Sequence, residues 1–239
     1  MAIDTRVVQY QLAGETYEGF FACDAAVSEP RPAVLIAPTW AGRGGFEQEK
    51  AERLARAGYA ALALDLYGGG RQGSGPEENA GLMAPLLADR AQLQARMTAG
   101  VDAAAALPEV DASRIAAIGY CFGGLAVLDL ARSGAQLCGV VSIHGLFTPA
   151  DNLPEPSIQA RVLCLHGYDD PMVTPDSLLA LADEMTAAGA DWQIHAYGGT
   201  VHAFTNPAAN DPERGAVYNA SADRRSWQSL QNFLAEVLA

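Results

Sequence analysis

Residues Ile115–Leu128 read IAAIGYCFGGLAVL, and this stretch decides the fold. An apolar strand pattern, Ile115–Ile118, runs directly into an apolar helix pattern, and Gly119, Cys121 and Gly123 form a G-x-C-x-G sequence at the junction. It matches the strand–turn–helix pattern of a nucleophile elbow, with sulfur in place of the usual serine oxygen. We therefore predict that the turn raises Cys121 above the carboxyl edge of a sheet, at a helix N-terminus whose partial positive charge favours a thiolate.

The four cysteines differ in their sequence surroundings. A free cysteine is most often a small buried apolar side chain, and Cys23, Cys138 and Cys164 lie in or beside strand patterns without a turn, so we expect them in the core. Only Cys121 has the strand, the turn, the helix and the following glycine pair. The cysteines are far apart and form no CxxC, which argues against a disulfide framework or zinc site and favours a reducing, cytoplasmic setting.

Strand and helix patterns alternate on both sides of this junction. Two alternating runs, Arg6–Leu12 and Thr16–Cys23, flank Gly14 and predict an antiparallel hairpin. Six further strands are expected from short apolar runs at Ala33–Ala37, Ala60–Leu64, Ile115–Ile118, Gly139–Ile143, Val162–Leu165 and Trp192–Tyr197. Outside the central stretch, helices are expected at Phe46–Ala57, Leu93–Leu107, Pro175–Ala188 and Trp227–Val237.

This order predicts one α/β domain over residues 1–239, with a mainly parallel sheet of about eight strands and helices on both faces. Residues 68–92, rich in glycine and then in acidic residues, are expected to be a connecting segment and a candidate lid.

Composition narrows the classes of partner. Half of the 239 residues are hydrophobic and 18% are charged, which is enough apolar material for one large core. The formal net charge of −13 disfavours binding to nucleic acid. The sequence start lacks the pattern of a signal peptide, and no apolar run approaches the roughly 18 residues of a membrane span. We expect no nucleic-acid and no membrane partner.

A thiol nucleophile needs a base, and the base needs a carboxylate to orient it. In this strand order the acid and then the histidine should each follow a later strand. Asp170 follows Val162–Leu165, and His202 follows Trp192–Tyr197. Asp169 is the alternative acid, although the proline that follows Asp170 constrains the backbone there and favours Asp170.

The other three histidines are expected to be structural. His144 and His166 end apolar strand patterns, where a hydrogen-bonded core histidine is the commoner case, and His195 alternates within a strand. None of them follows the last strand, where the order of the three groups requires the base.

The chain resembles the dienelactone hydrolase family of α/β-hydrolases over almost its whole length. The resemblance rests on the initial hairpin and on the segments AALALDLY (60–67), GYCFGG (119–124), HGYDDP (166–171) and HAF (202–204). It implies an α/β-hydrolase fold, a Cys121–Asp170–His202 triad, and a monomeric or dimeric cytosolic hydrolase of small esters or lactones that uses no cofactor and no metal.

Two backbone amides should hold the oxyanion in such a site. Phe122 follows the nucleophile and is expected to supply one of them. The other is expected from Trp40, which holds the matching position in the loop after Ala33–Ala37, where Pro38 cannot donate. Aromatic residues expected at the pocket wall are Trp40, Tyr67, Tyr120 and Phe204.

Two positions depart from the family pattern. Thr39 stands where the resemblance places a glutamate that engages the resting thiol, and Asn206 stands where it places an arginine that anchors a substrate carboxylate. Dienelactone itself is therefore a doubtful substrate. Arg43, Arg71 and Arg90 are candidate replacements for the missing cation, with solvated surface positions expected for each.

The resulting hypothesis is a hydrolase that cleaves carboxylic esters or lactones through a thioester on Cys121. Alternatives that remain open are a thioesterase or peptidase with the same triad, a non-catalytic binding protein, and a peroxide-sensing thiol protein.

Overall fold

The computed structural model describes residues 2–152 and 157–239. Its main sheet has the strand order β1-β2-β4-β3-β5-β6-β7-β8. Strands pair in parallel at β3/β4, β6/β7 and β7/β8 and antiparallel at β1/β2 and β2/β4, which confirms the expected mainly parallel α/β fold. The chain divides into two compact units, residues 1–118 and 119–239. The single domain over 1–239 stays a prediction.

The first unit begins with the hairpin of β1 (Ile3–Leu12) and β2 (Glu15–Asp24). Its two-residue turn has positive φ at both Ala13 (51°) and Gly14 (85°), the backbone that suits a tight hairpin. The remaining strands of this unit are β3 (Arg31–Ala37), β4 (Ala60–Ala63) and most of β5 (Val110–Tyr120).

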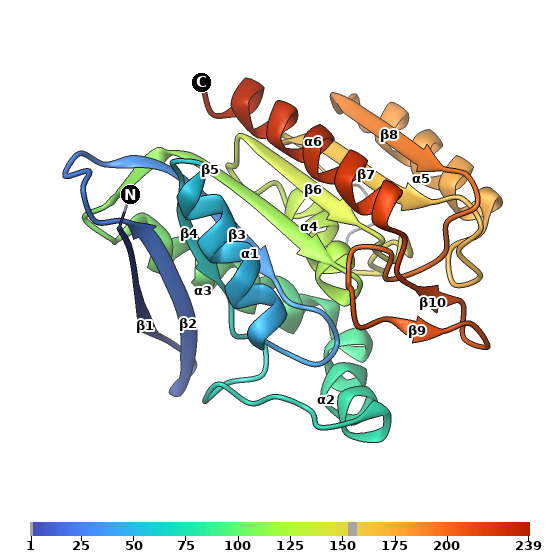
Figure 1. The fold of residues 1–239 in the computed structure, drawn as a ribbon, viewed down its shortest axis with the longest axis horizontal. Coiled ribbons are helices and arrows are strands. Elements are labelled where there is room, and N and C mark those ends of the chain that lie inside the picture. Colours follow the sequence, from blue (N-terminus) through green and yellow to red (C-terminus); the bar gives the residue numbers. More distant parts are fainter. Residues whose placement is uncertain (1, 153–156) are drawn as a thin grey trace. The chain divides into compact units, whose positions relative to one another are not determined.

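Helices cover both faces of this unit's strands. In Figure 1, α1 (Gly45–Arg56) lies in front of them and α3 (Arg90–Ala105) behind. Both helices match the expected positions to within a few residues, because each carries apolar residues at helical spacing that pack on the strands.

The connecting segment of residues 68–92, the candidate lid, contains a helix that was not predicted, α2 (Pro76–Ala88). Its start has Pro76 at the first position and two acidic residues in the first turn, both of which favour a helix N-terminus. Only Asn79 and Leu86 are buried in it, and Pro85 interrupts its interior, so its apolar periodicity was too weak to predict it. The glycine-rich stretch 68–75 is indeed irregular.

The second unit has the same layering. Strands β6 (Gly139–Ile143), β7 (Arg161–Gly167) and β8 (Trp192–Tyr197) run in parallel. Figure 1 shows α6 (Ala220–Val237) in front of these strands, with α4 (Phe122–Arg132) and α5 (Pro175–Ala187) behind them.

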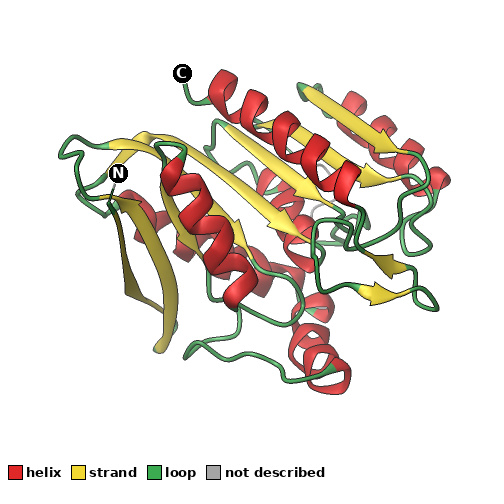
Figure 2. Ribbon diagram, in the orientation of Figure 1, coloured by secondary structure: helices red, strands yellow, loops and turns green. Residues whose placement is uncertain are grey.

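This unit also holds a small two-stranded ribbon that the sequence analysis did not predict. Strands β9 (Asn210–Asp211) and β10 (Ala216–Val217) pair antiparallel after β8, as the short arrows in Figure 2 show. Each strand has only two residues, which is too short for an alternating pattern that would predict the ribbon.

Within the described ranges 2–152 and 157–239, no helix combines the length and apolar character that crossing a bilayer requires.

Candidate active site

Cys121 occupies a tight turn between β5 and α4. Strand β5 ends at Tyr120, helix α4 begins at Phe122, and Cys121 between them has φ 56° and ψ −116°. A Cβ on Gly119 would lie 2.0 Å from the Gly123 carbonyl oxygen, so only glycine fits there. Cys121 is half-buried, which leaves its side chain partly accessible. The predicted strand–turn–helix geometry is confirmed.

Asp170 and His202, the predicted acid and base, meet in a buried hydrogen bond. His202 Nδ1 lies 2.7 Å from Asp170 Oδ2, with Asp170 2% and His202 3% exposed. The neighbouring Asp169 instead accepts a bond from the backbone N–H of Thr200. Of the two candidate acids, it is therefore Asp170 that contacts His202.

The electrostatic surroundings of His202 favour its charged form. Burial opposes a charge on the ring, but the influence of the Cys121 and Asp170 side chains outweighs it and raises the pKa of His202 to about 10. His202 Nε2 has no aligned hydrogen-bond partner among the described residues. We attribute the influence of Cys121 to its nearby charge rather than to a well-formed bond, which leaves Nε2 available for proton transfer.

The β9–β10 ribbon holds the loop that carries His202. The His202 N–H donates to the Gly215 carbonyl at 2.9 Å, and the Val217 N–H donates to the His202 carbonyl at 3.1 Å. Gly215 has φ 65°, and a Cβ on it would lie 2.3 Å from Pro171 Cγ. The ribbon therefore contacts both the base and the residue that follows Asp170.

His144 lies closer to the triad than its expected structural role implied. Its Nδ1 accepts the Cys121 N–H at 3.2 Å, and its Nε2 lies 2.8 Å from Thr205 Oγ1. Its ring centroid is 5.3 Å from that of His202. The sequence did contain an indication of this position. His144 follows a strand next to β5, and residues at the carboxyl ends of parallel strands meet at one edge of the sheet, as was argued for Asp170 and His202.

The other two histidines make contacts of a core type. His166 is fully buried, and its ring centroid lies 5.2 Å from that of Phe147. His195 on β8 pairs its Nδ1 with Ser229 Oγ on α6 at 3.1 Å. The contact of His195 agrees with the structural role expected for it. His166 is buried as expected, but neither of its ring nitrogens has a hydrogen-bond partner among the described residues, so the expected hydrogen bond is not formed.

Thr39, Trp40 and Tyr67 belong to the first unit, in loops that brace one another. The Thr39 N–H donates to Glu47 Oε1 at 3.0 Å, and the Tyr67 hydroxyl donates to the Trp40 carbonyl at 2.8 Å. Glu47 is buried, and desolvation raises its pKa although Thr39 and Gly44 donate to it. Thr39 and Trp40 are half-buried, whereas Tyr67 is buried.

The remaining pocket candidates belong to the second unit. Tyr120 and Phe204 are buried, and their rings pack beside His144. Asn206 is half-buried, and its side chain accepts the Ala208 N–H. Contact of these three residues with substrate stays a prediction, as does an oxyanion hole formed by the Phe122 and Trp40 amides.

The expectation of a solvated position is wrong for Arg43, which is only 7% exposed. Arg71 is exposed, but its guanidinium binds the carbonyls of Gly68 and Tyr67. Arg90 is half-buried.

Cys23 and Cys164 are buried, as expected, and Cys138 is half-buried. Among the residues that the structure describes, no group of three histidine, cysteine, aspartate or glutamate side chains could hold a metal ion.

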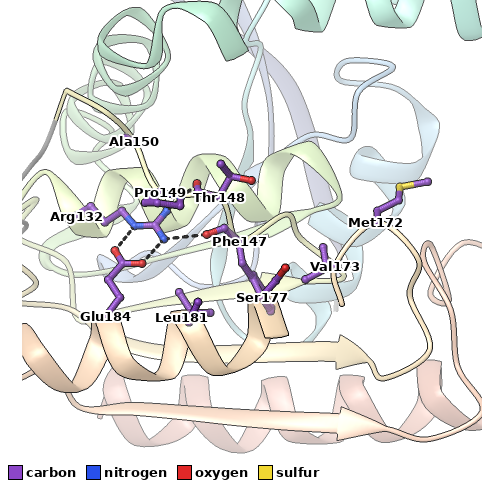
Figure 3. A pocket seen from close by; sticks show the side chains of 11 residues that line it. Arg132, Phe147, Thr148, Pro149, Ala150, Met172, Val173, Ser177, Leu181 and Glu184 are labelled. Atoms are coloured by element: carbon purple, nitrogen blue, oxygen red, sulfur yellow. Dashed lines mark hydrogen bonds and ion pairs between the residues drawn. The ribbon is translucent and has the colours of Figure 1, made fainter. Parts of the chain in front are cut away.

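A pocket of about 410 Å³ lies beside α4 and α5 in the second unit (Figure 3). Its described lining contains no triad residue. Arg132 at its edge binds Glu184 through two contacts, Nε–Oε1 at 2.7 Å and Nη2–Oε2 at 2.8 Å, and also donates to the Phe147 carbonyl. Arg132 thus joins α4, α5 and the segment after β6.

Comparison with known proteins identifies the family and the fold of the chain. The sequence profile of the dienelactone hydrolase family matches residues 18–238. A solved dienelactone hydrolase-like promiscuous phosphotriesterase from metagenomic libraries is 37% identical over 100% of both chains, with a TM-score of 0.95. A solved protein designated m3DLH is 38% identical over 100% of both chains, also with a TM-score of 0.95. An uncharacterized protein of Caenorhabditis elegans is 34% identical over 62% of this chain and 96% of its own. The chain therefore belongs to the dienelactone hydrolase family.

Proposed function

We propose that this hydrolase cleaves small carboxylic esters or lactones through a thioester on Cys121. The observation that carries the proposal is the buried hydrogen bond between Asp170 and His202, whose pKa the Cys121 and Asp170 side chains raise. A thiolate–imidazolium pair supplies the nucleophile and the acid together. The proposal includes a small-molecule substrate, a monomeric or homodimeric chain, and a reducing, cytoplasmic setting that keeps the thiol reduced.

Acylation follows from these charges. The Cys121 thiolate adds to the carbonyl carbon, and the backbone amides of Phe122 and Trp40 stabilise the oxyanion. When the carbon–oxygen bond breaks, the His202 imidazolium gives its Nε2 proton to the leaving alkoxide. Asp170 keeps its bond to Nδ1 throughout and so fixes the ring orientation and tautomer.

Deacylation reverses the proton transfer. Neutral His202 takes a proton from water while the hydroxide adds to the thioester carbonyl. The carbon–sulfur bond then breaks, the thiolate leaves, and the carboxylic acid is released. The thiolate–imidazolium pair is restored without any outside reactant other than water.

The test compares Cys121→Ala with Cys138→Ala, a matched loss of a half-buried thiol elsewhere in the second unit. On short-chain p-nitrophenyl esters and a lactone panel, we expect Cys121→Ala to lose at least about 10³-fold in kcat and Cys138→Ala to keep wild-type turnover. Equal turnover by Cys121→Ala and wild type would contradict the proposal.

Comparing kcat/KM for an ester, a thioester and an anilide of the same acyl group distinguishes an esterase from a thioesterase or a peptidase with the same triad. We expect the highest kcat/KM for the ester. A preference for the thioester or the anilide would indicate a thioesterase or a peptidase. Absence of turnover of all three by the wild type would favour the binding or redox-sensing alternatives.

A second candidate activity is hydrolysis of phosphotriesters, because a relative 37% identical over its full length is a promiscuous phosphotriesterase. The Cys121 thiolate would add to phosphorus, and the aryloxide would leave with the proton of the His202 imidazolium. Neutral His202 would then take a proton from water while the hydroxide breaks the sulfur–phosphorus bond and releases the thiolate. A p-nitrophenyl dialkyl phosphate tests this activity. Turnover that survives Cys121→Ala would exclude the shared site.

A further inference from the structure

His144 connects the nucleophile turn to the loop that carries the base. It lies directly after β6, and its side chain is buried, with the residue 1% exposed. On one side of the ring, Nδ1 accepts the backbone N–H of Cys121 at 3.2 Å. On the other side, Nε2 lies 2.8 Å from the hydroxyl of Thr205, three residues after His202. One imidazole therefore bonds to both catalytic segments.

These two contacts fix the protonation of the ring. The Cys121 N–H is shared between the Ile143 carbonyl at 3.1 Å and His144 Nδ1 at 3.2 Å. Because a backbone N–H only donates, His144 Nδ1 presents a lone pair in this arrangement. The single proton of the neutral ring then lies on Nε2, which donates to Thr205 Oγ1. A second proton on Nδ1 would point at the Cys121 N–H, so two donors would face each other. The contacts therefore favour a neutral ring with the proton on Nε2.

Ring packing orients the base against the same side chain. The His144 and His202 rings meet at 65° with centroids 5.3 Å apart, and the Phe204 ring meets His144 at 80° and 5.2 Å. Tilted contacts of this kind restrict rotation of both partners. His144 therefore contacts the base ring as well as the loop beyond it.

The backbone at these positions is strained. Cys121, His144 and Ala203 have φ of 56°, 39° and 55°, values that side-chain-bearing residues rarely adopt. Such conformations persist where surrounding contacts hold them, and they gather at functional sites. Cys121 carries the thiol, His144 carries the imidazole, and Ala203 follows His202. The contacts of His144 therefore connect three segments whose backbone conformations are unfavourable.

From these contacts we infer that His144 is a positioning residue: as a neutral Nε2–H imidazole it holds the Cys121 turn and the His202 loop in register. It transfers no proton and touches no reacting atom. Its effect on turnover rests on the proposed function, whereas its effect on the reactivity of the Cys121 sulfur does not.

Three variants separate the two hydrogen bonds. His144→Leu removes both, and Thr205→Val removes the hydroxyl at nearly constant shape. His144→Asn keeps an acceptor oxygen near the position of Nδ1, and asparagine adopts positive φ readily. The control is His195→Gln, which alters a second histidine–hydroxyl pair outside the site.

We expect His144→Leu to lower kcat about 10- to 100-fold with KM within about twofold of wild type. His144→Asn should recover part of that loss, Thr205→Val should lose severalfold, and His195→Gln should match wild type. Wild-type kcat in both His144→Leu and Thr205→Val would overturn the inference, and so would a loss in His195→Gln equal to that in His144→Leu.

Two readouts do not require turnover. The pH profile of Cys121 alkylation by iodoacetamide should change in His144→Leu and Thr205→Val but not in His195→Gln. Long-range ¹H–¹⁵N spectra of the folded wild type should show His144 as the neutral Nε2–H tautomer, and a proton on Nδ1 would overturn the assignment. If the wild type cleaves no ester, the proposed function fails while these two results still decide the role of His144.

Discussion

Gly215, in the turn between β9 and β10, lies directly against Pro171, the residue that follows the predicted acid Asp170. A Cβ at position 215 would come within 2.3 Å of Pro171 Cγ, and within 2.6 Å of its Cδ. The ribbon that bonds to the His202 backbone thus also abuts the acid loop, so one small element locates both members of the buried pair.

Substitution of Gly215 should therefore reduce both stability and turnover. Gly215→Ala and the control Gly189→Ala share nearly the same φ, 65° and 67°, but nothing lies within 4 Å of a Cβ at Gly189. The backbone cost should be about 1–2 kcal/mol in both variants. The contact with Pro171 should cost Gly215→Ala about 1–3 kcal/mol more. Urea unfolding and kcat check this, and equal losses in the two variants would refute the contact.

Asp170 and Asp169 form a matched pair for testing the acid. Asp170→Asn should lower kcat by roughly 10²–10⁴-fold, because His202 loses the carboxylate that orients it and stabilises its charge. Among the described residues, the Asp169 side chain accepts a hydrogen bond from the backbone N–H of Thr200, so Asp169→Asn should stay within about threefold of wild type. Steady-state kinetics on one ester measures both. Equal effects would mean that the 2.7 Å contact does not identify the acid.

Titration of His202 should reflect its charged neighbours. We expect an NMR midpoint near pH 10 in the wild type and a lower midpoint in Cys121→Ser, because the thiolate is the largest influence that raises the pKa. Cys138→Ser should leave the midpoint unchanged. An identical midpoint in Cys121→Ser and wild type would show that the thiolate does not hold the proton.

The same shift predicts a pH dependence of stability. Histidine in an unfolded chain titrates near pH 6.5, so between about pH 6.5 and 10 the folded protein keeps a proton that the unfolded chain has lost. The contribution of His202 is thus complete below about pH 6.5 and declines until about pH 10. Urea unfolding across this interval should show a decline that is absent in His202→Gln.

The Arg132–Glu184 pair should stabilise the second unit. The Arg132 side chain is 1% exposed and also pairs with Asp129, so Glu184→Gln removes one of its two carboxylate partners and should lower the free energy of unfolding by about 2 kcal/mol. The control Glu52→Gln breaks an exposed pair with Arg56 on α1 and should cost no more than about 0.5 kcal/mol. Urea unfolding of both variants distinguishes the two cases, and similar costs would contradict the prediction.

Local sequence was enough to predict the nucleophile turn and the approximate positions of the acid and base. The glycines around Cys121 indicate a tight turn, because larger residues would not fit there. The uniformly apolar strands indicate a parallel sheet, and Asp170 and His202 each follow the carboxyl end of one of its strands. The proline that follows Asp170 already favoured it over Asp169, and the hydrogen bond to His202 agrees with that choice.

Other features depend on contacts distant in sequence. His144 and Thr205 are 61 residues apart, and nothing near either residue indicates their hydrogen bond. The two-residue strands of the ribbon are too short to show an alternating pattern. The backbone hydrogen bonds of the ribbon to His202 join residues that no local pattern connects. Arg43 was expected in solvent because an arginine in a loop usually lies there, yet tertiary packing buries it.

The backbone angles of Cys121 admit a small unbranched side chain and disfavour a β-branched one. The turn depends on its glycines and not on the sulfur. Cysteine and serine differ by one side-chain atom and by a single base in their codons. One mutational step can therefore exchange thiol for alcohol at position 121 while the scaffold stays intact, which leaves natural variation free to sample two nucleophiles on one framework.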